Sequence, residues 1–220
     1  HAIVPRLPAH EALTPWTCHR GELAYGPWRF VMGPGTTVWE PKPDWGALSV
    51  TPDSLHYLLS IVLEAVARHR MIIDPHYSVA IDLGVTRLLR AVAAGDGDAI
   101  ETATRRVAGL GPGLTPYGDD VLAGVILALW AAHHPKCLEI GTCIAGVAAS
   151  NTNRLSRAFL DAASQGFADA LWHGLLEALS RCDRDAIARA AHRAVAVGAT
   201  SGVAMLRGFV CGFDVIRRVL

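Results

Sequence analysis

The chain has 220 residues, of which 51% are hydrophobic and 18% charged, and its formal net charge is zero. A chain of this length and apolar content can bury a large core in one domain or two closely packed lobes, which excludes an intrinsically disordered protein. Nucleic-acid-binding proteins usually carry a basic surplus, so the balanced charge argues against that class. No apolar run is long enough to cross a bilayer, and we expect no membrane segment.

The spacing of cysteines and histidines argues against disulfide and metal chemistry. The five cysteines are odd in number and include no CxxC pair, and the histidines show no HxxxH or HExxH spacing. We therefore expect reduced thiols, no metal and no cofactor. The first residues lack the apolar core of a secretory signal, so the sequence predicts a cytoplasmic protein. Abundant alanine, with arginine far exceeding lysine, is typical of a bacterial protein from a GC-rich genome.

The first part of the chain, residues 1–50, is predicted to form a small β-rich lobe. It holds most of the prolines and tryptophans. Residues 22–33 and 36–41 combine aromatic and β-branched side chains with Gly/Pro turns, a pattern typical of short strands. We expect four tryptophans to pack within this lobe: Trp16, Trp28, Trp39 and Trp45.

From residue 51 the pattern becomes helical. Thr51-Pro52-Asp53 supplies a capping hydroxyl, a proline suited to the first helical position and an acid in the first turn. Later helices are expected to end at Gly95 and Gly166. The sequence thus predicts an α+β fold that is mostly helical and bundle-like over residues 51–220. Further helices are expected at residues 85–95, 98–107, 119–133, 135–150, 151–165, 167–180, 183–197 and 201–219.

Residues 109–120, GLGPGLTPYGDD, interrupt this helical pattern with four glycines and two prolines. Glycines let a backbone approach a ligand closely, and prolines stiffen the loop. Free N–H groups ahead of a helix N-terminus form an anion site, and the Thr115 hydroxyl adds a donor for a phosphate or carboxylate oxygen. We therefore predict a small anionic substrate on this loop, bound by the residues Gly111, Gly113, Leu114, Thr115 and Gly118.

The two aspartates at the end of the loop have different expected roles. Either Asp119 or Asp120 is expected to cap the following helix. The other carboxylate is then free to accept hydrogen bonds from a substrate amine or amide, or to hold a metal ion. A tight helix–helix connection with an aspartate cap is the alternative interpretation. A Walker A or Rossmann loop does not fit, because the preceding strand and the lysine spacing are missing.

Residues 109–124, GLGPGLTPYGDDVLAG, resemble the signature of the AllH family, which includes a subunit associated with oxamate carbamoyltransferase in anaerobic allantoin breakdown. Tyr117 stands where serine is usual in that signature, and Val121 where phenylalanine is common. Two further segments, residues 151–166 and 197–208, are similar in placement to other family segments. The similar positions are Thr152, Asn153, Ser156, Leu160, Ala163 and Gly166 in the first, and Gly198, Thr200, Ser201 and Gly202 in the second.

The resemblance implies a carbamoyltransferase-like transferase or one of its subunits. Such chemistry needs a phosphate cradle, donors for the carbonyl oxygen and an acceptor for the proton of the nitrogen. Arg154 is a candidate partner for a carboxylate or phosphate, and Ser156, Thr200 and Ser201 are candidates to orient the substrate. The implied catalytic residues are Asp119, Asp120 and Ser201. Thr152 and Asn153 complete the implied substrate-binding set.

Two departures from the family pattern leave the function open. Ala199 stands where the family often has histidine, and Ala204 where it often has aspartate. The chain is therefore an enzyme acting on a small carbamoyl or carboxylate compound, a non-catalytic subunit that needs partner subunits, or a stand-alone enzyme of specialised metabolism that reuses the pocket. The two missing polar side chains favour the non-catalytic subunit among these three.

Overall fold

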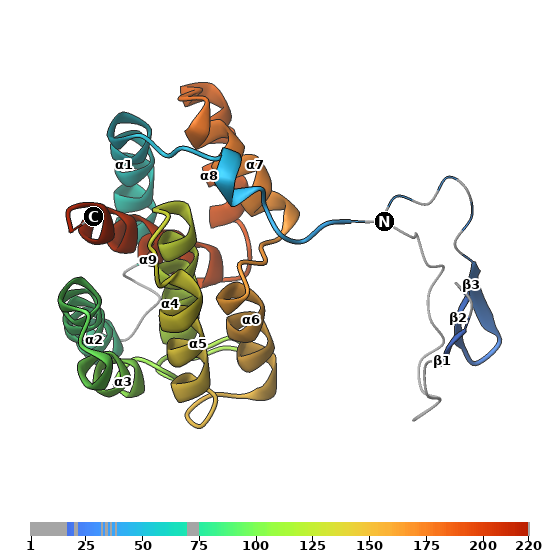
Figure 1. Cartoon of the computed structure of the whole chain (residues 1–220), viewed down its shortest axis with the longest axis horizontal. Helices are drawn as coiled ribbons and strands as arrows, with labels where there is room; N and C mark the ends of the chain where they lie inside the picture. Colours follow the sequence, from blue (N-terminus) through green and yellow to red (C-terminus); the bar gives the residue numbers. More distant parts are fainter. Residues whose placement is uncertain are drawn as a thin grey trace. The chain divides into compact units, whose positions relative to one another are not determined.

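The computed structural model describes residues 17–19, 22–31, 33, 35, 37, 39–69 and 75–219. The chain divides into two compact units, residues 1–40 and 41–220. The first contains a small antiparallel sheet, and the described residues of the second form helices and their connections (Figure 1). The mostly helical α+β fold predicted from the sequence is confirmed.

The sheet of the first unit is a three-stranded meander, β1 Thr17–His19, β2 Glu22–Tyr25 and β3 Trp28–Val31, in that order. The predicted strand segment at residues 22–33 is confirmed: its two strands pair with Leu23 opposite Phe30. They are joined through Gly26, whose φ of +53° glycine adopts without strain. The described residues of the second predicted segment, 37 and 39–41, are not in a strand, and Trp16 lies outside the described residues.

The second unit is built around one almost fully buried helix, α4 Tyr117–Ala131. Its sequence, YGDDVLAGVILALWA, is apolar on every face, which is typical of a helix surrounded by others. α9 Ser201–Arg217, α6 Arg154–Ser164 and α5 Cys137–Ala148 pack directly against it. The remaining helices complete the bundle: α1 Pro52–His69, α2 Pro75–Ala94, α3 Gly97–Arg105, α7 Ala170–Ser180 and α8 Arg184–Val195.

Glycines bring α4 and α9 into backbone contact. A Cβ on Gly124 of α4 would lie 2.0 Å from the carbonyl oxygen of Met205, and a Cβ on Gly208 of α9 would lie 2.0 Å from that of Val121. Further along, Gly212 lies against Val125. The contact positions rise together along both helices, so α4 and α9 run in the same general direction. Their N-termini therefore lie at the same side of the helical unit.

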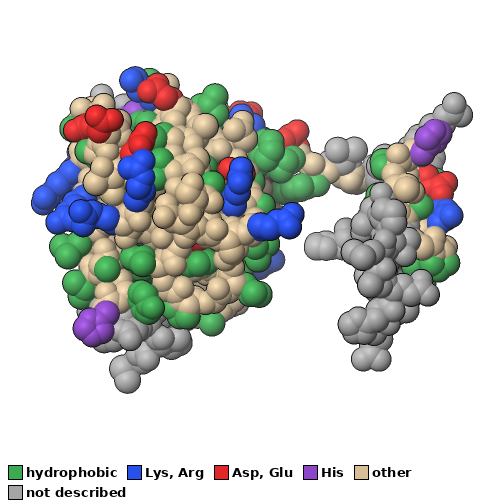
Figure 2. Space-filling view, turned by 90° about the horizontal axis from the view of Figure 1, so that it is seen from below, with side chains coloured by type: hydrophobic (Ala, Val, Ile, Leu, Met, Phe, Trp, Pro, Cys, Tyr) green, Lys and Arg blue, Asp and Glu red, His purple; other side chains and the backbone are tan. Residues whose placement is uncertain are grey.

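Most predicted helix boundaries agree with the structure to within a few residues. Ser54 N donates to the Thr51 hydroxyl, as the capping prediction required. Gly95 and Gly166 have φ values of +67° and +79° at the ends of α2 and α6, which confirms both as helix stops. Within the described residues, no helix combines the length and apolarity needed to cross a membrane. On the face seen in Figure 2, acidic and basic side chains of the helical unit are interspersed with apolar ones.

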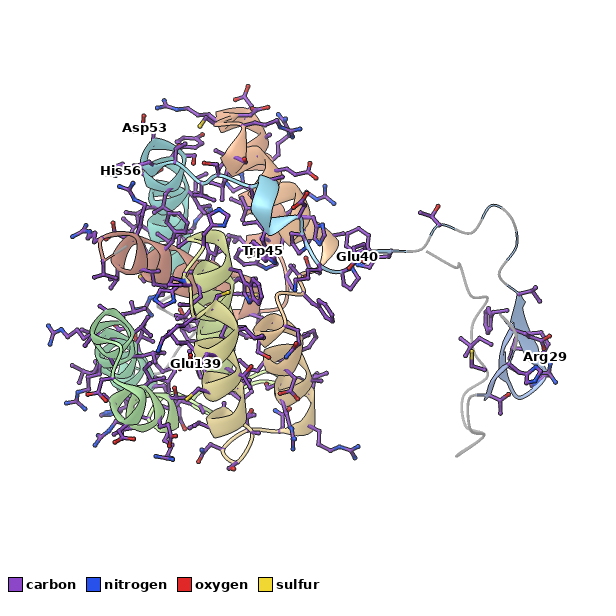
Figure 3. The ribbon with its side chains drawn as sticks, in the orientation of Figure 1. Arg29, Glu40, Trp45, Asp53, His56 and Glu139 are labelled. Carbon is purple, nitrogen blue, oxygen red and sulfur yellow. The ribbon has the colours of Figure 1, made fainter. Side chains whose placement is uncertain are left out.

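The segment before α1 belongs to the helical unit. Trp45, which is labelled in Figure 3, begins a short 3₁₀ helix, Trp45–Ala47. Its Nε1 donates to the carbonyl oxygen of Gly166 at 3.0 Å, and its ring stacks on Trp130 with centroids 6.1 Å apart. The prediction that Trp45 packs within the β lobe is therefore wrong. The aromatic side chain of Trp45 predicts a buried residue, but it does not indicate which unit buries that residue.

Candidate functional site

A cavity of about 460 Å³ lies where the N-termini of α4 and α9 meet α6, α7 and α8. Its walls are mostly apolar, with Trp172, Leu171 and Met205 among the larger side chains. Three residues of the predicted site line it: Thr115, Asp120 and Ser201. The volume falls within the range of small-molecule sites, about 300–1,000 Å³.

These three residues form one hydrogen-bonded cluster, which we call the polar cluster. Thr115 Oγ1 donates to Asp120 Oδ2 at 3.1 Å and lies 2.9 Å from Ser201 Oγ. Either hydroxyl can be the donor in the contact between Thr115 and Ser201. Eighty-six residues of chain separate Thr115 from Ser201, so packing of α9 on α4 creates the cluster.

The environment of the polar cluster changes the acidity of Asp120. Burial raises the pKa of its carboxyl group to about 6, against hydrogen bonds from Ser201 and Thr115 that lower it, and the neighbouring Asp119 carboxylate adds a further upward shift. At neutral pH the group is therefore mostly ionised but close to its titration range. A carboxylate tuned in this way suits a general base that works near pH 7.

Asp119 has a different position and is only 2% exposed. Its Oδ1 accepts from the backbone N–H of Gly109 at 2.8 Å, and its Oδ2 accepts from the Thr152 hydroxyl. It thus joins the start of the glycine loop to the connection between α5 and α6. The expectation that Asp119 or Asp120 caps α4 is wrong, because the helix begins earlier, with Pro116 at the N-cap position and no side-chain cap.

A backbone hydrogen bond closes the glycine loop at its base, while several of its N–H groups have no partner among the described residues. Gly118 N donates to Leu110 O at 2.8 Å, which closes the loop at its base. Gly111 and Gly113 adopt φ values of +101° and +118°, a region where glycine is favoured. Within the described part of the chain, the N–H groups of Gly111, Gly113, Leu114 and Thr115 make no hydrogen bond.

The segment after α5 supports the loop. Asn153 caps α6, since its Oδ1 accepts from the N–H groups of Leu155 and Ser156 at 2.9 and 3.0 Å. Its Nδ2 also donates to the carbonyl oxygen of Leu114 at 2.8 Å. Leu114 itself is 83% exposed. Asn153 therefore connects the N-terminus of α6 with the middle of the loop.

Ten of the thirteen predicted site residues lie outside the lining of the described cavity, among them Asp119, Asn153 and the four loop residues Gly111, Gly113, Leu114 and Gly118. Arg154 is exposed on the first turn of α6, and Ser156 is buried one turn from the loop contact. The Ser156 hydroxyl has no hydrogen-bond partner among the described residues. Thr152 is bonded to Asp119, and Thr200 is the N-cap residue of α9 without a side-chain cap bond.

The cavity also contains residues that the sequence patterns did not identify. Asp169 caps α7, with its Oδ1 accepting from the N–H groups of Leu171 and Trp172 at 2.9 and 3.0 Å. The sequence placed residue 169 inside a helix predicted to begin at residue 167. An aspartate two residues before an apolar helical run signals an N-cap, and that signal identifies Asp169. Among the described residues, no group of three or more His, Cys, Asp or Glu side chains is placed to hold a metal ion.

Comparison with known proteins identifies this same region. The model of the family described as oxamate carbamoyltransferase subunit AllH matches residues 107–213. The matched stretch includes the glycine loop and the whole polar cluster. No curated protein and no solved structure matches the chain. Over residues 107–213 the chain is therefore AllH-like, as the sequence of its glycine loop predicts.

Proposed function

We propose that the chain is a carbamoyltransferase-type subunit that binds a small substrate where Thr115, Asp120 and Ser201 meet. The observation that supports this most directly is their hydrogen-bonded convergence on one cavity from segments that both lie in the AllH match. The family description names a subunit, so we infer that partner subunits complete the enzyme.

The proposed substrate has an anionic end and an N–H end, as oxamate does. The free N–H groups of Gly111, Gly113 and Leu114 precede the N-terminus of α4, where the helix dipole favours an anion. The Asp120 carboxylate would repel that end but accept a hydrogen bond from an amide nitrogen. The substrate would therefore bind with its carboxylate on the loop and its nitrogen on Asp120.

Asp120 is the proposed acceptor of the proton. When the nitrogen attacks the carbamoyl carbon of a carbamoyl phosphate, a C–N bond forms, the C–O bond to phosphate breaks, and the phosphate leaves with the electron pair. The nitrogen loses its proton to Asp120, whose pKa of about 6 suits this transfer at neutral pH. Ser201 and Thr115 hold the carboxylate in place.

The experiment is a binding titration with oxamate and with carbamoyl phosphate, by calorimetry. Asp120→Asn and Thr115→Val should weaken binding at least about tenfold, which is about 1.4 kcal/mol, without lowering Tm. Asp98→Asn and Thr102→Val are matched controls, because both residues are exposed on α3 and should bind as the parent does. Unchanged affinity in both loop variants would show that the loop is a structural connection.

A non-catalytic role within the same assembly is the second candidate. Ala204 is completely buried and Ala199 offers no acid or base, so neither position supplies the polar group common in the family. In that case the purified chain binds oxamate, and Asp120→Asn leaves the turnover of carbamoyl phosphate by the complete assembly unchanged. Turnover by the chain alone would exclude this candidate.

A further inference from the structure

The cavity is larger and more apolar than oxamate requires. Its volume of about 460 Å³ is that of a site for ligands with a sizeable apolar body. Apolar side chains come from α6, α7, α8 and α9 and form most of its surface. The larger ones are Phe159, Phe167, Leu171, Trp172, Val197 and Met205.

The apolar wall is preorganised on one side and open on the other. Trp172 is 4% exposed, donates its Nε1–H to Met205 Sδ at 3.2 Å and packs on Phe209 with ring centroids 5.1 Å apart. These contacts fix the indole ring before any ligand arrives. In contrast, Phe159 and Phe167 are 58% and 40% exposed, so a ligand in the cavity can shield apolar surface that now faces water.

The charged groups of the cavity are all acidic. Asp120 and Asp169 contribute carboxylates, and none of the residues lining the cavity in the described part of the chain is lysine or arginine. Asp169 Oδ1 caps α7, and its Oδ2 makes no hydrogen bond with the described residues. Asp169 is exposed to water, whereas Asp120 is partly buried beside apolar side chains, so a ligand that brings a positive charge or N–H donors compensates the Asp120 carboxylate in particular.

We propose that this cavity takes a primary amine with an apolar substituent of about the size of a phenylalkyl group. The ammonium group lies on Asp120, with Thr115 and Ser201 beside it, and the substituent packs against Trp172, Leu171 and Met205. This inference rests on the proposed function only in assigning the polar cluster as the substrate site. It extends the nitrogen compounds that the site accepts from oxamate to apolar amines.

The test compares ligands that differ in one property at a time, with calorimetry at pH 7.5 on the full chain. 2-Phenylethylamine should bind at least tenfold more tightly than ethylamine, which lacks the apolar part. It should also bind at least tenfold more tightly than 3-phenylpropionate, which has an anion in place of the cation. Equal or tighter binding of 3-phenylpropionate overturns the assignment of a cationic ligand.

Variants locate the ligand within the cavity. Asp120→Asn should weaken 2-phenylethylamine at least tenfold but leave the neutral 2-phenylethanol within about twofold. Ala162→Phe fills the apolar part and should abolish the advantage of 2-phenylethylamine over ethylamine. Ala158→Phe is the matched control on α6, because Ala158 is exposed and outside the cavity lining. Tm values confirm that each variant is folded.

The outcomes separate this inference from the proposed function. If oxamate binds in an Asp120-dependent manner and no phenylalkylamine binds, the apolar-amine assignment is wrong and the proposed function stands. If neither class binds, or if Asp120→Asn changes neither affinity, both are wrong. Binding of 2-phenylethylamine that survives Asp120→Asn and Ala162→Phe unchanged also overturns the inference.

Discussion

Two adjacent aspartates of the same loop have opposite environments. Asp119 is buried and accepts hydrogen bonds from Gly109 N and the Thr152 hydroxyl, so its charge is compensated within the protein. Asp120 lies at the cavity, and burial raises its pKa to about 6. Asp119 therefore stabilises the loop, and Asp120 is the carboxylate at the cavity, which the proposed function assigns to the substrate.

The role of Asp119 predicts a stability loss. Asp119→Ala leaves the Gly109 N–H and the Thr152 hydroxyl without their acceptor, and we expect a cost of about 2–4 kcal/mol in the free energy of unfolding. Denaturant titration measures it. Asp98→Ala, an exposed first-turn acid on α3, should cost less than about 1 kcal/mol. Equal effects of the two changes would contradict a structural role for Asp119.

The raised pKa of Asp120 predicts a pH-dependent stability. Because the folded-state pKa lies above the ordinary value of 3.8, ionisation costs the folded chain more than the unfolded one. The contribution of the protonated group is complete below about pH 4 and is lost as the pH rises through about 6. Asp120→Asn removes this loss. As the pH rises from 4 to 8, the free energy of unfolding of the variant should therefore increase by up to about 3 kcal/mol relative to that of the parent. A stability difference that stays constant between these pH values would show that Asp120 titrates normally.

At the scale of elements, the site depends on how closely α9 approaches α4. Gly124 and Gly208 allow backbone contact between the two helices, and this contact positions Ser201, the first residue of α9, beside Thr115. The preceding Gly198, with φ of +63°, lies against Ser201 and turns the chain into α9. The packing of α9 on α4 therefore also assembles the polar cluster.

Gly124→Ala should destabilise the chain and disturb the polar cluster. Its Cβ would lie 2.0 Å from Met205 O and 2.7 Å from Phe209 N, both backbone atoms, so the helices must separate. We expect the free energy of unfolding to fall by about 1–3 kcal/mol or more. Gly146→Ala on α5 is the matched control, because its Cβ meets nothing within 4 Å; it should stabilise by about 0.5–1 kcal/mol. Thermal unfolding distinguishes the two, and a neutral Gly124→Ala would contradict the close approach.

At the scale of the whole molecule, the described cavity and core lie in residues 41–220. The segment from Pro41 to Val50 belongs to that unit: Pro41 O accepts from Ala168 N at 2.8 Å, and Trp45 and Val50 are buried in the core. The change in sequence pattern predicts a boundary at residue 50, whereas the contacts divide the chain between residues 40 and 41.

Truncation tests which division describes an independent folding unit. A chain of residues 41–220 should unfold cooperatively with a Tm close to that of the whole protein. A chain of residues 50–220 loses the Trp45 ring and should be less stable by about 3–5 kcal/mol, as expected for removal of a buried tryptophan. Trp45→Ala in the full chain should reproduce most of that loss. Equal Tm values for the two truncated chains would place the boundary at residue 50.

Much of the architecture was predictable because local patterns determine it. Helical spacing with Thr51 at one end and glycines such as Gly95 and Gly166 at others gave most helix positions. An N-cap residue that also fits the helical spacing is harder to recognise. The pattern predicts a helix from residue 167, whereas α7 begins at Ala170, directly after its N-cap Asp169. Thr115, Asp120 and Ser201, which the sequence predicts as site residues, line the cavity together with Trp172 and Met205. The sequence does not single out Trp172 and Met205, since an apolar residue on a helix carries no mark of which cavity it faces.

The sequence by itself determined the helical class, the stiff glycine loop and the AllH-like character of residues 107–213, because backbone φ preferences, capping side chains and a contiguous signature are properties of neighbouring residues. Only the tertiary structure decided that Asp120 and not Asp119 lines the cavity and that Trp45 packs in the helical unit. It also decided that Ser201 lies within hydrogen-bond distance of Thr115, 86 residues away in the sequence. These outcomes depend on the close packing of α4 on α9. Such packing sets burial, and burial sets the pKa and the hydrogen-bond partners of each side chain.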